Sequence, residues 1–147
     1  MERKQIRVTD GPKAIGPYSS AIQAGETLYI SGQLPVDVSS QIVGDSIGDQ
    51  TKQAIDNLEL TLQAAGLTLN DVVKTTVFLS DFNNFDKMNQ IYAIYFTHPY
   101  PARSCFEVSR LPKDALVEIE AIAVAKVMPS FEPEPTNEDC EGRYCED

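Results

Sequence analysis

The stretch from Tyr100 to Ala125 reads YPARSCFEVSRLPKDALVEIEAIAVA and decides the fold, because it holds two extended segments joined by a turn. The first segment runs from Arg103 to Val108, and the second from Leu116 to Lys126. Both are rich in β-branched and apolar residues, which favours strands. Residues 111–114, with a proline in second place, form the turn between them.

The second of these strands carries two glutamates inside an otherwise apolar run. Because the side-chain period of a strand is two, Glu118 and Glu120 share one face with Leu116, Ile122 and Val124. A single-layer sheet with an apolar face of this kind usually buries that face against another subunit. The pattern therefore predicts an oligomer.

Working outward, apolar periodicity and Gly/Pro punctuation define the remaining elements. We expect an edge strand over 1–8, a hairpin of strands 18–24 and 27–31, a loop over 35–48, helices over 49–65 and from an N-cap at Asp81 to 96, and a strand over 72–79. The order β-β-β-α-β-α-β-β is typical of an α+β domain in which two helices pack on one face of a mixed sheet.

The chain has 147 residues, of which 42% are hydrophobic, and this suits one compact domain, assigned to residues 1–127. Residues 128–147 are rich in Pro and Glu and hold seven acids against one arginine, a net charge of −6 out of −10. Residues 1–127 therefore carry −4. The composition of 128–147 predicts a mobile acidic tail.

The acidic balance disfavours nucleic-acid binding, which needs a basic surface. No run approaches 18 apolar residues, and the first residues lack the apolar block of a signal peptide, so we expect a cytoplasmic protein with no membrane partner, a mitochondrial pool remaining open. The cysteines Cys105, Cys140 and Cys145 match no zinc pattern, and we expect no metal. Reduced thiols are expected, and a Cys140–Cys145 disulfide stays open.

Arg103 and the glutamates are the first candidates for chemistry. Arginine matches a carboxylate with two parallel donors, and a cation beside a partly buried carboxylate is a site for a small anionic substrate. A surface ion pair or a strand cap is the alternative for Arg103. Either Glu118 or Glu120 can act as a general base, or can form an ion pair.

Other candidates have equally plain alternatives. Cys105 lies on the same strand face as Arg103, and is either a nucleophile paired with His98 or, more simply, an inert buried thiol. Tyr18 either points into a cleft or is a half-buried strand residue. Ser31-Gly32 either lets a ligand approach the backbone closely or forms an ordinary turn.

The motifs resemble those of the RidA/YjgF family, also called L-PSP or reactive intermediate deaminases. The resemblance spans about residues 3–127, and its segments are 14–19 (AIGPYS), 30–35 (ISGQLP), 57–58 (NL), 64–67 (AAGL), 73–79 (VKTTVFL), 86–96, 101–104 (PARS), 111–113 (LPK) and 117–121 (VEIEA). It implies a chorismate-mutase-like α+β fold, assembled as a homotrimer with clefts between subunits.

The resemblance also implies an activity: hydrolysis of 2-imino and 2-enamino acids, such as 2-iminopropanoate and 2-iminobutanoate, to 2-oxo acids and ammonia, with no cofactor. It assigns the substrate anchor to Arg103 and the water-positioning acid to Glu118. The remaining site residues are Tyr18 as a catalytic group and Ser31, Gly32, Asn89 and Cys105 as substrate-binding groups, whereas Glu120 receives no role. Some relatives are labelled endoribonucleases or translation inhibitors, and a non-catalytic or chaperone-like carboxylate binder is the other alternative.

Overall fold

The computed structural model describes residues 1–126, so the tail assigned to 128–147, with Cys140 and Cys145, lies outside the described residues. The strands are β1 (Arg3–Ile6), β2 (Ala21–Ala24), β3 (Thr27–Gln33), β4 (Val72–Leu79), β5 (Ala102–Glu107) and β6 (Val117–Val124). The helices are α1 (Ile47–Ala64) and α2 (Phe85–Tyr95), with short 3-10 turns η1 (Leu69–Asp71), η2 (Phe82–Asn84) and η3 (Pro112–Asp114).

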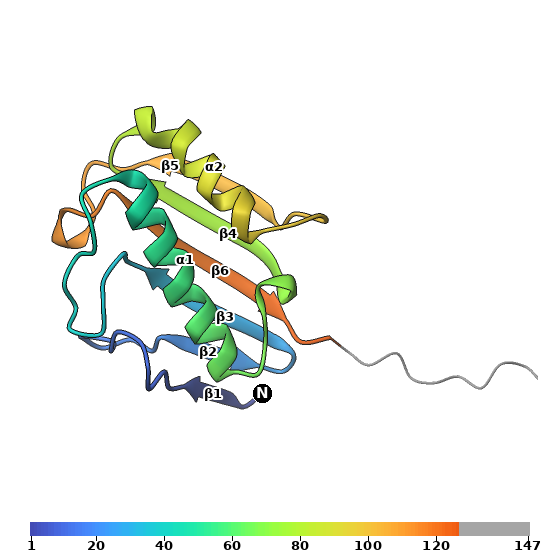
Figure 1. Cartoon of the computed structure of the whole chain (residues 1–147). Helices are drawn as coiled ribbons and strands as arrows, with labels where there is room; N and C mark the ends of the chain where they lie inside the picture. Colours follow the sequence, from blue (N-terminus) through green and yellow to red (C-terminus); the bar gives the residue numbers. More distant parts are fainter. Residues whose placement is uncertain (127–147) are drawn as a thin grey trace, which may run out of the picture.

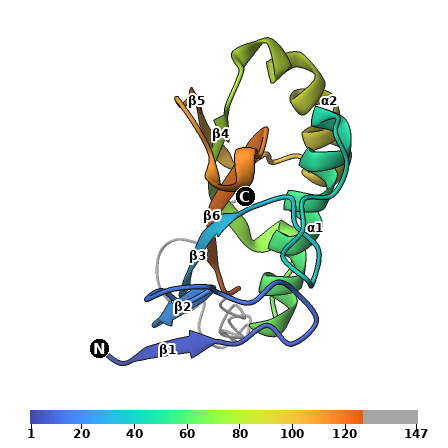
Figure 2. The same ribbon diagram turned by 90° about the vertical axis from the view of Figure 1, so that its left-hand side faces the viewer.

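The strands form one six-stranded sheet in the order β1-β2-β3-β6-β4-β5 (Figure 1). All neighbours pair antiparallel except β4 and β5, which are parallel. Both helices cover the same face of this sheet, and no described element covers the other face (Figure 2). The expected α+β fold, with two helices on one face of a mixed sheet, is therefore confirmed.

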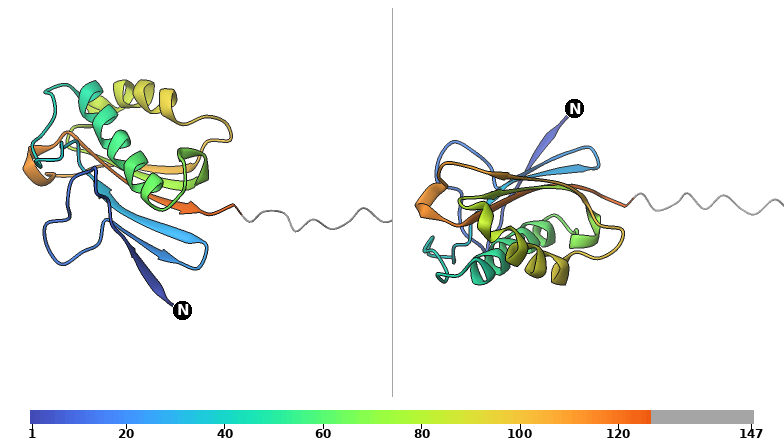
Figure 3. Two further views of the ribbon diagram at one scale, coloured as in Figure 1. Left: turned by 60° about the horizontal axis from the view of Figure 1, so that its bottom comes forward. Right: turned by 90° about the horizontal axis from the view of Figure 1, so that it is seen from above.

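The connections explain why both helices share a face. β3 and β4 are parallel because each is antiparallel to β6 between them, so α1 is a crossover between parallel strands. α2 is a second crossover, from β4 to β5. Both move across the sheet in the same direction, and such crossovers are almost always right-handed, which puts both helices on one side (Figure 3).

The first helix has clear start and stop signals. The Ser46 side chain accepts a hydrogen bond from the Asp49 amide at 3.1 Å and caps the N-terminus. At the other end Gly66 adopts φ +75° and donates to Gln63, while Leu67 donates to Leu62, the Schellman pattern. The predicted stop at this glycine is confirmed.

Side chains of β6 alternate as predicted, and this alternation defines the two faces of the sheet. Val117, Ile119 and two alanines further along are buried under the helices, whereas Glu118 and Ile122 lie on the uncovered face. Leu116 was expected on the uncovered face, but it precedes β6 and packs against the core under the helices.

Two of the element boundaries that differ from the predictions have a clear local cause. Tyr18 precedes β2 instead of beginning it, because its amide donates to the Gly16 carbonyl and closes a local turn. Asp81 caps η2 rather than α2: its carboxylate accepts from the Asn83 amide at 2.9 Å. The helix itself starts four residues later, at Phe85.

A buried amide ties α1 to the loop that follows β3. The Asn57 side chain is 2% exposed and donates to the carbonyls of Leu34 and Val36, at 2.9 and 2.8 Å. The Gln53 side-chain amide donates to the Asn57 side-chain oxygen, Oδ1, at 3.0 Å. Both polar atoms of the side-chain amide are thus paired, and the loop is held against α1.

We predict that Asn57→Ala lowers the free energy of unfolding by about 2–3 kcal/mol, because three hydrogen bonds of its side chain are lost and the Leu34 carbonyl loses its side-chain partner. Chemical denaturation followed by circular dichroism measures this. Asn70→Ala, at an exposed position, is the control and is expected to change stability by less than about 0.5 kcal/mol. Equal effects of the two substitutions would contradict the role given to Asn57.

Candidate active site

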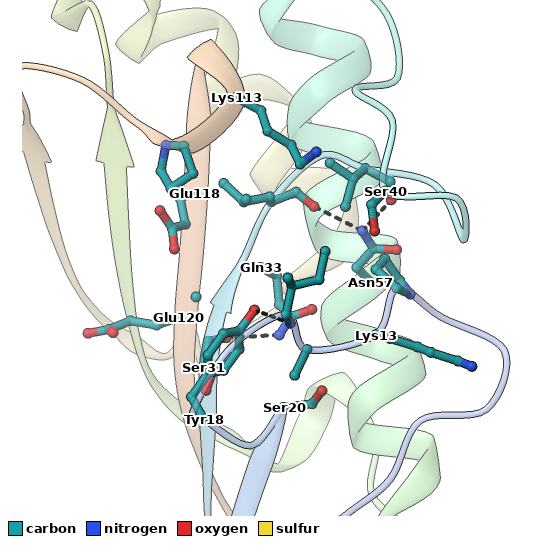
Figure 4. A pocket seen from close by; sticks show the side chains of 17 residues that line it. Lys13, Tyr18, Ser20, Ser31, Gln33, Ser40, Asn57, Lys113, Glu118 and Glu120 are labelled. Carbon is teal, nitrogen blue, oxygen red and sulfur yellow. Dashed lines mark hydrogen bonds between the residues drawn. The ribbon is translucent and has the colours of Figure 1, made fainter.

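An open pocket of about 740 Å³ lies on the uncovered side of the sheet, at the end of β3 (Figure 4). Its walls come from the segment before β2, from β3 and the loop after it, from η3 and from β6. Four of the predicted site residues line it: Tyr18, Ser31, Gly32 and Glu118. The sequence stretches that carry them are far apart, so the fold brings this part of the predicted site together.

The wall from β3 is a β-bulge. Ile30 pairs with Ala121 and Gln33 with Ile119, so two residues, Ser31 and Gly32, face a single residue of β6. A Cβ placed on Gly32 would lie 2.0 Å from Glu118 Oε1 and 3.1 Å from its Cγ. Any other residue at position 32 would force the Glu118 side chain to move, so glycine here allows the close approach of that side chain as well as the bulge.

Glu118 is the half-buried acid of this pocket. Burial raises the pKa of its carboxyl group, and the negative charge of Glu120 raises it further. Glu120 also borders the pocket but is exposed, and its side chain points away from the other labelled residues (Figure 4). Of the two glutamates, Glu118 is the half-buried one, and a carboxyl group with a raised pKa is a candidate for proton transfer.

Tyr18 and Ser31 are held beside each other by local hydrogen bonds (Figure 4). The Ser31 hydroxyl donates to the Ser19 carbonyl at 2.6 Å, and its amide donates to the Ser20 carbonyl at 3.0 Å. The Tyr18 hydroxyl accepts from the Ile15 amide at 3.3 Å. The tyrosine is 54% exposed, so it is a residue of the pocket rim and not a half-buried strand residue.

Arg103 is a residue of β5, and its side chain lies against α2. Its guanidinium carbon is 4.8 Å from the centroid of the Tyr92 ring and 5.7 Å from that of Phe85. Within residues 1–126 the salt bridges are Lys52–Asp56 and Arg110–Asp114, and neither involves Arg103. The arginine is thus neither fully solvated nor neutralised by an acid.

Asn89 and Cys105 lie on the same side of the sheet as Arg103. Asn89 follows Phe85 by four residues and precedes Tyr92 by three, so all three share the helix face turned toward Arg103. The Asn89 Oδ1 atom is buried and has no hydrogen-bond partner among the described residues. Cys105 lies on the same strand face as Arg103, as predicted.

The Cys105 thiol has no activating partner within the described residues. Burial raises the pKa of the thiol, and the positive charge of Arg103 only opposes that shift. No hydrogen bond joins it to His98 in residues 1–126, and the His98 ring instead packs on Tyr100 with centroids 4.1 Å apart. The environment of Cys105 does not activate it as a nucleophile.

The predicted site residues therefore fall into two groups on opposite faces of the sheet. Arg103 pairs with Thr75 of β4 and faces α2, whereas Glu118 pairs with Phe78 and faces away from the helices. β4 also separates their strands. The expectation that the arginine lies beside the glutamate does not hold within one chain, because each side chain follows the alternation of its own strand.

The sequence did not predict three kinds of residue around these groups: a buried amide, two aromatic rings and a lysine. Asn57 was noted only as part of a motif, although a polar residue on the buried face of a helix is a signal of a tertiary hydrogen bond. Phe85 and Tyr92 fall on the apolar face of the second predicted helix, and the periodicity does not show that their rings contact an arginine. Lys113, with φ +59°, also lines the pocket and was read only as a turn residue.

A second pocket of about 460 Å³ lies near His98 and Lys126, at the far end of the sheet. Within residues 1–126 no group of three or more His, Cys, Asp or Glu side chains is placed to hold a metal ion. None of the helices in this part of the chain combines the length and the apolar character needed to span a membrane.

Comparison with known proteins agrees with this arrangement. A family described as Endoribonuclease L-PSP matches residues 8–125. The chain belongs to this L-PSP family, also called RidA/YjgF. A RutC family protein of Pyrococcus horikoshii is 54% identical over 122 residues, covering 82% of this chain and 97% of that protein.

Two further L-PSP relatives have more specific descriptions. A mouse protein named 2-iminobutanoate/2-iminopropanoate deaminase is 51% identical over 123 residues, covering 83% of this chain and 91% of its own. The crystal structure of E. coli TdcF with bound serine has a TM-score of 0.79 and 42% identity, covering 84% of this chain and 99% of that chain.

We predict that Glu120→Gln lowers the pKa of Glu118, because it removes a negative charge that disfavours ionisation of the neighbouring carboxyl. A pH titration of the Glu118 carboxyl carbon by NMR measures the shift. Glu26→Gln, in the exposed turn between β2 and β3, is the matched control and should leave that pKa unchanged. An unchanged or higher pKa in Glu120→Gln would show that the two carboxylates do not interact.

Proposed function

We propose that this protein hydrolyses 2-imino and 2-enamino acids, such as 2-iminopropanoate and 2-iminobutanoate, to 2-oxo acids and ammonia. The observation that carries the proposal is Glu118, a half-buried carboxyl with a raised pKa that borders an open pocket beside Gly32. The mouse relative that is 51% identical bears the name of this deaminase. The serine in the TdcF structure is a small amino acid, similar in size to these substrates.

We further propose that the site is completed between copies in a homotrimer. One copy would supply Arg103 with Asn89 and Cys105, and the next would supply the pocket around Glu118. The opposite placement of Arg103 and Glu118 in one chain supports this, since neither side chain can cross the sheet. Ile122 and Val124 give the uncovered face an apolar character that suits burial against another subunit.

In this arrangement Arg103 binds the substrate carboxylate. A guanidinium donates two parallel hydrogen bonds to a carboxylate, and this fixes both the position and the orientation of the adjacent imine carbon. The imine carbon is already electrophilic, so placement contributes more than activation. An arginine that has no acid partner among residues 1–126 is free to take this role.

Glu118 holds the water that attacks the imine carbon. Its carboxylate accepts a proton from the water as the carbon–oxygen bond forms to the protonated imine, which gives a carbinolamine. Glu118 then passes that proton to the nitrogen, ammonia leaves as the carbon–nitrogen bond breaks, and the hydroxyl proton returns to the Glu118 carboxylate as the carbonyl of the 2-oxo acid forms. The raised pKa makes Glu118 a better proton acceptor than an ordinary surface glutamate.

Tyr18 and the bulge complete the pocket around the reacting atoms. The Tyr18 hydroxyl, on the rim, is suited to pass a proton to the departing nitrogen or to close the pocket over the substrate. The absent side chain of Gly32 leaves room for the Glu118 carboxylate. The mechanism needs no thiol nucleophile, in line with the protonated state of Cys105.

The alternative suggested by the family description is an endoribonuclease. A net charge of −10 and a single histidine suit RNA cleavage poorly. A protein that only binds small carboxylates is the other alternative, and Arg103 alone would serve it. The half-buried Glu118 favours the hydrolase, because a binding site for an anion gains nothing from a nearby acid.

We predict that Arg103→Ala lowers the rate constant for imine hydrolysis on the order of a hundred- to several-thousandfold, the effect of losing two charge-assisted hydrogen bonds at about 1.5–3 kcal/mol each. Arg103→Lys should recover little, because lysine lacks the planar pair of donors. The assay couples a dehydratase that generates the imine to ammonia release.

The matched control is Arg110→Ala, which removes an exposed arginine that pairs with Asp114 within residues 1–126. It should retain near wild-type turnover. Near wild-type hydrolysis in Arg103→Ala would rule out the proposed anchor, and absence of hydrolysis by the wild-type protein would leave the carboxylate-binding alternative.

We also predict that the purified protein shows no salt-sensitive binding to single-stranded RNA, since the described residues of this acidic chain offer no basic aromatic surface. Fluorescence anisotropy with a labelled oligonucleotide at low and high salt measures this. RNA cleavage that disappears in Arg103→Ala would instead connect an RNase activity to the same site.

A further inference from the structure

Arg103 must meet two requirements that conflict in most proteins. An anion-binding arginine needs a fixed orientation, and it also needs an uncompensated charge. A carboxylate partner would fix the guanidinium but would neutralise it and occupy its donors. Here the guanidinium stacks on Tyr92 at 4.8 Å and on Phe85 at 5.7 Å, both within cation–π range, and no described acid pairs with it.

The two rings that contact Arg103 are themselves held in place. Tyr92 is 6% exposed, and its hydroxyl shares a 2.8 Å hydrogen bond with Thr75, which is fully buried in β4. The Tyr92 ring also stacks on Phe96, with centroids 4.4 Å apart. Phe85 stacks on Phe82 at 4.8 Å. Neither ring can turn away from Arg103 without breaking these contacts.

The Tyr92 hydroxyl stays protonated beside the arginine. Burial raises the pKa of the phenol, and the hydrogen bond to Thr75 and the charge of Arg103 only oppose this shift. A neutral ring attracts the cation through its quadrupole without cancelling its charge. The guanidinium carbon lies over both rings, and no acid within residues 1–126 pairs with its N–H groups, so these donors stay available to a carboxylate.

We propose that Tyr92 is a positioning residue for Arg103, with Phe85 as a weaker second support and Thr75 fixing the Tyr92 ring. The pair of rings orients the guanidinium and leaves its charge for the ligand carboxylate. This inference rests on the proposed function in taking that carboxylate to be the substrate's. It adds a reason why α2, which supplies both rings, is packed against the edge strand that carries Arg103.

The test measures binding of 2-oxobutanoate, a carboxylate that the protein does not turn over, by isothermal titration calorimetry on the full chain. Tyr92→Leu should raise the dissociation constant roughly five- to thirtyfold, the size expected for losing a half-buried cation–π contact. Phe85→Leu should raise it by about two- to fivefold, because its ring is more distant. In imine turnover the same variants should raise KM and leave kcat within about threefold.

Two controls separate positioning from a general loss of structure. Tyr95→Leu makes the same change on α2 at a residue that does not contact Arg103, and should change the dissociation constant by less than about twofold. In an Arg103→Ala background Tyr92→Leu should have little further effect, because no cation is left for the ring to position. Thermal unfolding confirms that each variant is folded.

The inference is overturned if folded Tyr92→Leu binds 2-oxobutanoate as the wild type does, or if it loses the same factor in the Arg103→Ala background. If Tyr92→Leu does not fold, Phe85→Leu decides, and wild-type binding by that variant overturns the inference. Binding is measured without turnover, so an absence of imine hydrolysis would remove the proposed function and leave this result unaffected.

Discussion

Successive side chains of a strand point to opposite faces of its sheet, and the arrangement of the whole site depends on this alternation. In β6 it buries Ile119 under the helices and leaves Glu118 on the uncovered face. In β5 it turns Arg103 toward α2. The two charged groups of the proposed reaction are thus separated by the sheet, and in the proposed trimer a second copy brings its Arg103 to the glutamate. Assembly is in this account a condition for activity.

A second constraint is the close packing around Glu118. A carboxyl group is buried at a free-energy cost, and here the cost is seen as a raised pKa. The β-bulge and Gly32 make the space for it, since any side chain at that position would collide with the carboxylate. Asn57 then fixes the loop that continues the pocket wall. The burial of Glu118, the bulge and Gly32 do not stabilise the fold by themselves. Together with Asn57 they produce one acid that is suited to hold a water.

Much of this structure could be predicted from the sequence, because short-range patterns determine it. The helical spacing of apolar residues gave α1, Gly66 marked its end, and β-branched runs gave β4 and β6 with the correct faces. The relative position of Arg103 and Glu118 could not be predicted, since it depends on strand order and on which face the helices cover. For the same reason Tyr92 looked like an ordinary core residue, and only the structure shows the arginine against its ring.

The central claim is that each site takes Arg103 from one copy and Glu118 from another. Mixing subunits tests it most directly: Arg103→Ala and Glu118→Gln proteins, each poorly active alone, are co-expressed and assayed for imine hydrolysis. In a cyclic trimer with random assortment, the account predicts recovery of about a quarter of wild-type activity, because mixed trimers each contain one intact site. Mixed assemblies with no activity beyond that of the separate variants would contradict it and place both residues in the same subunit's site.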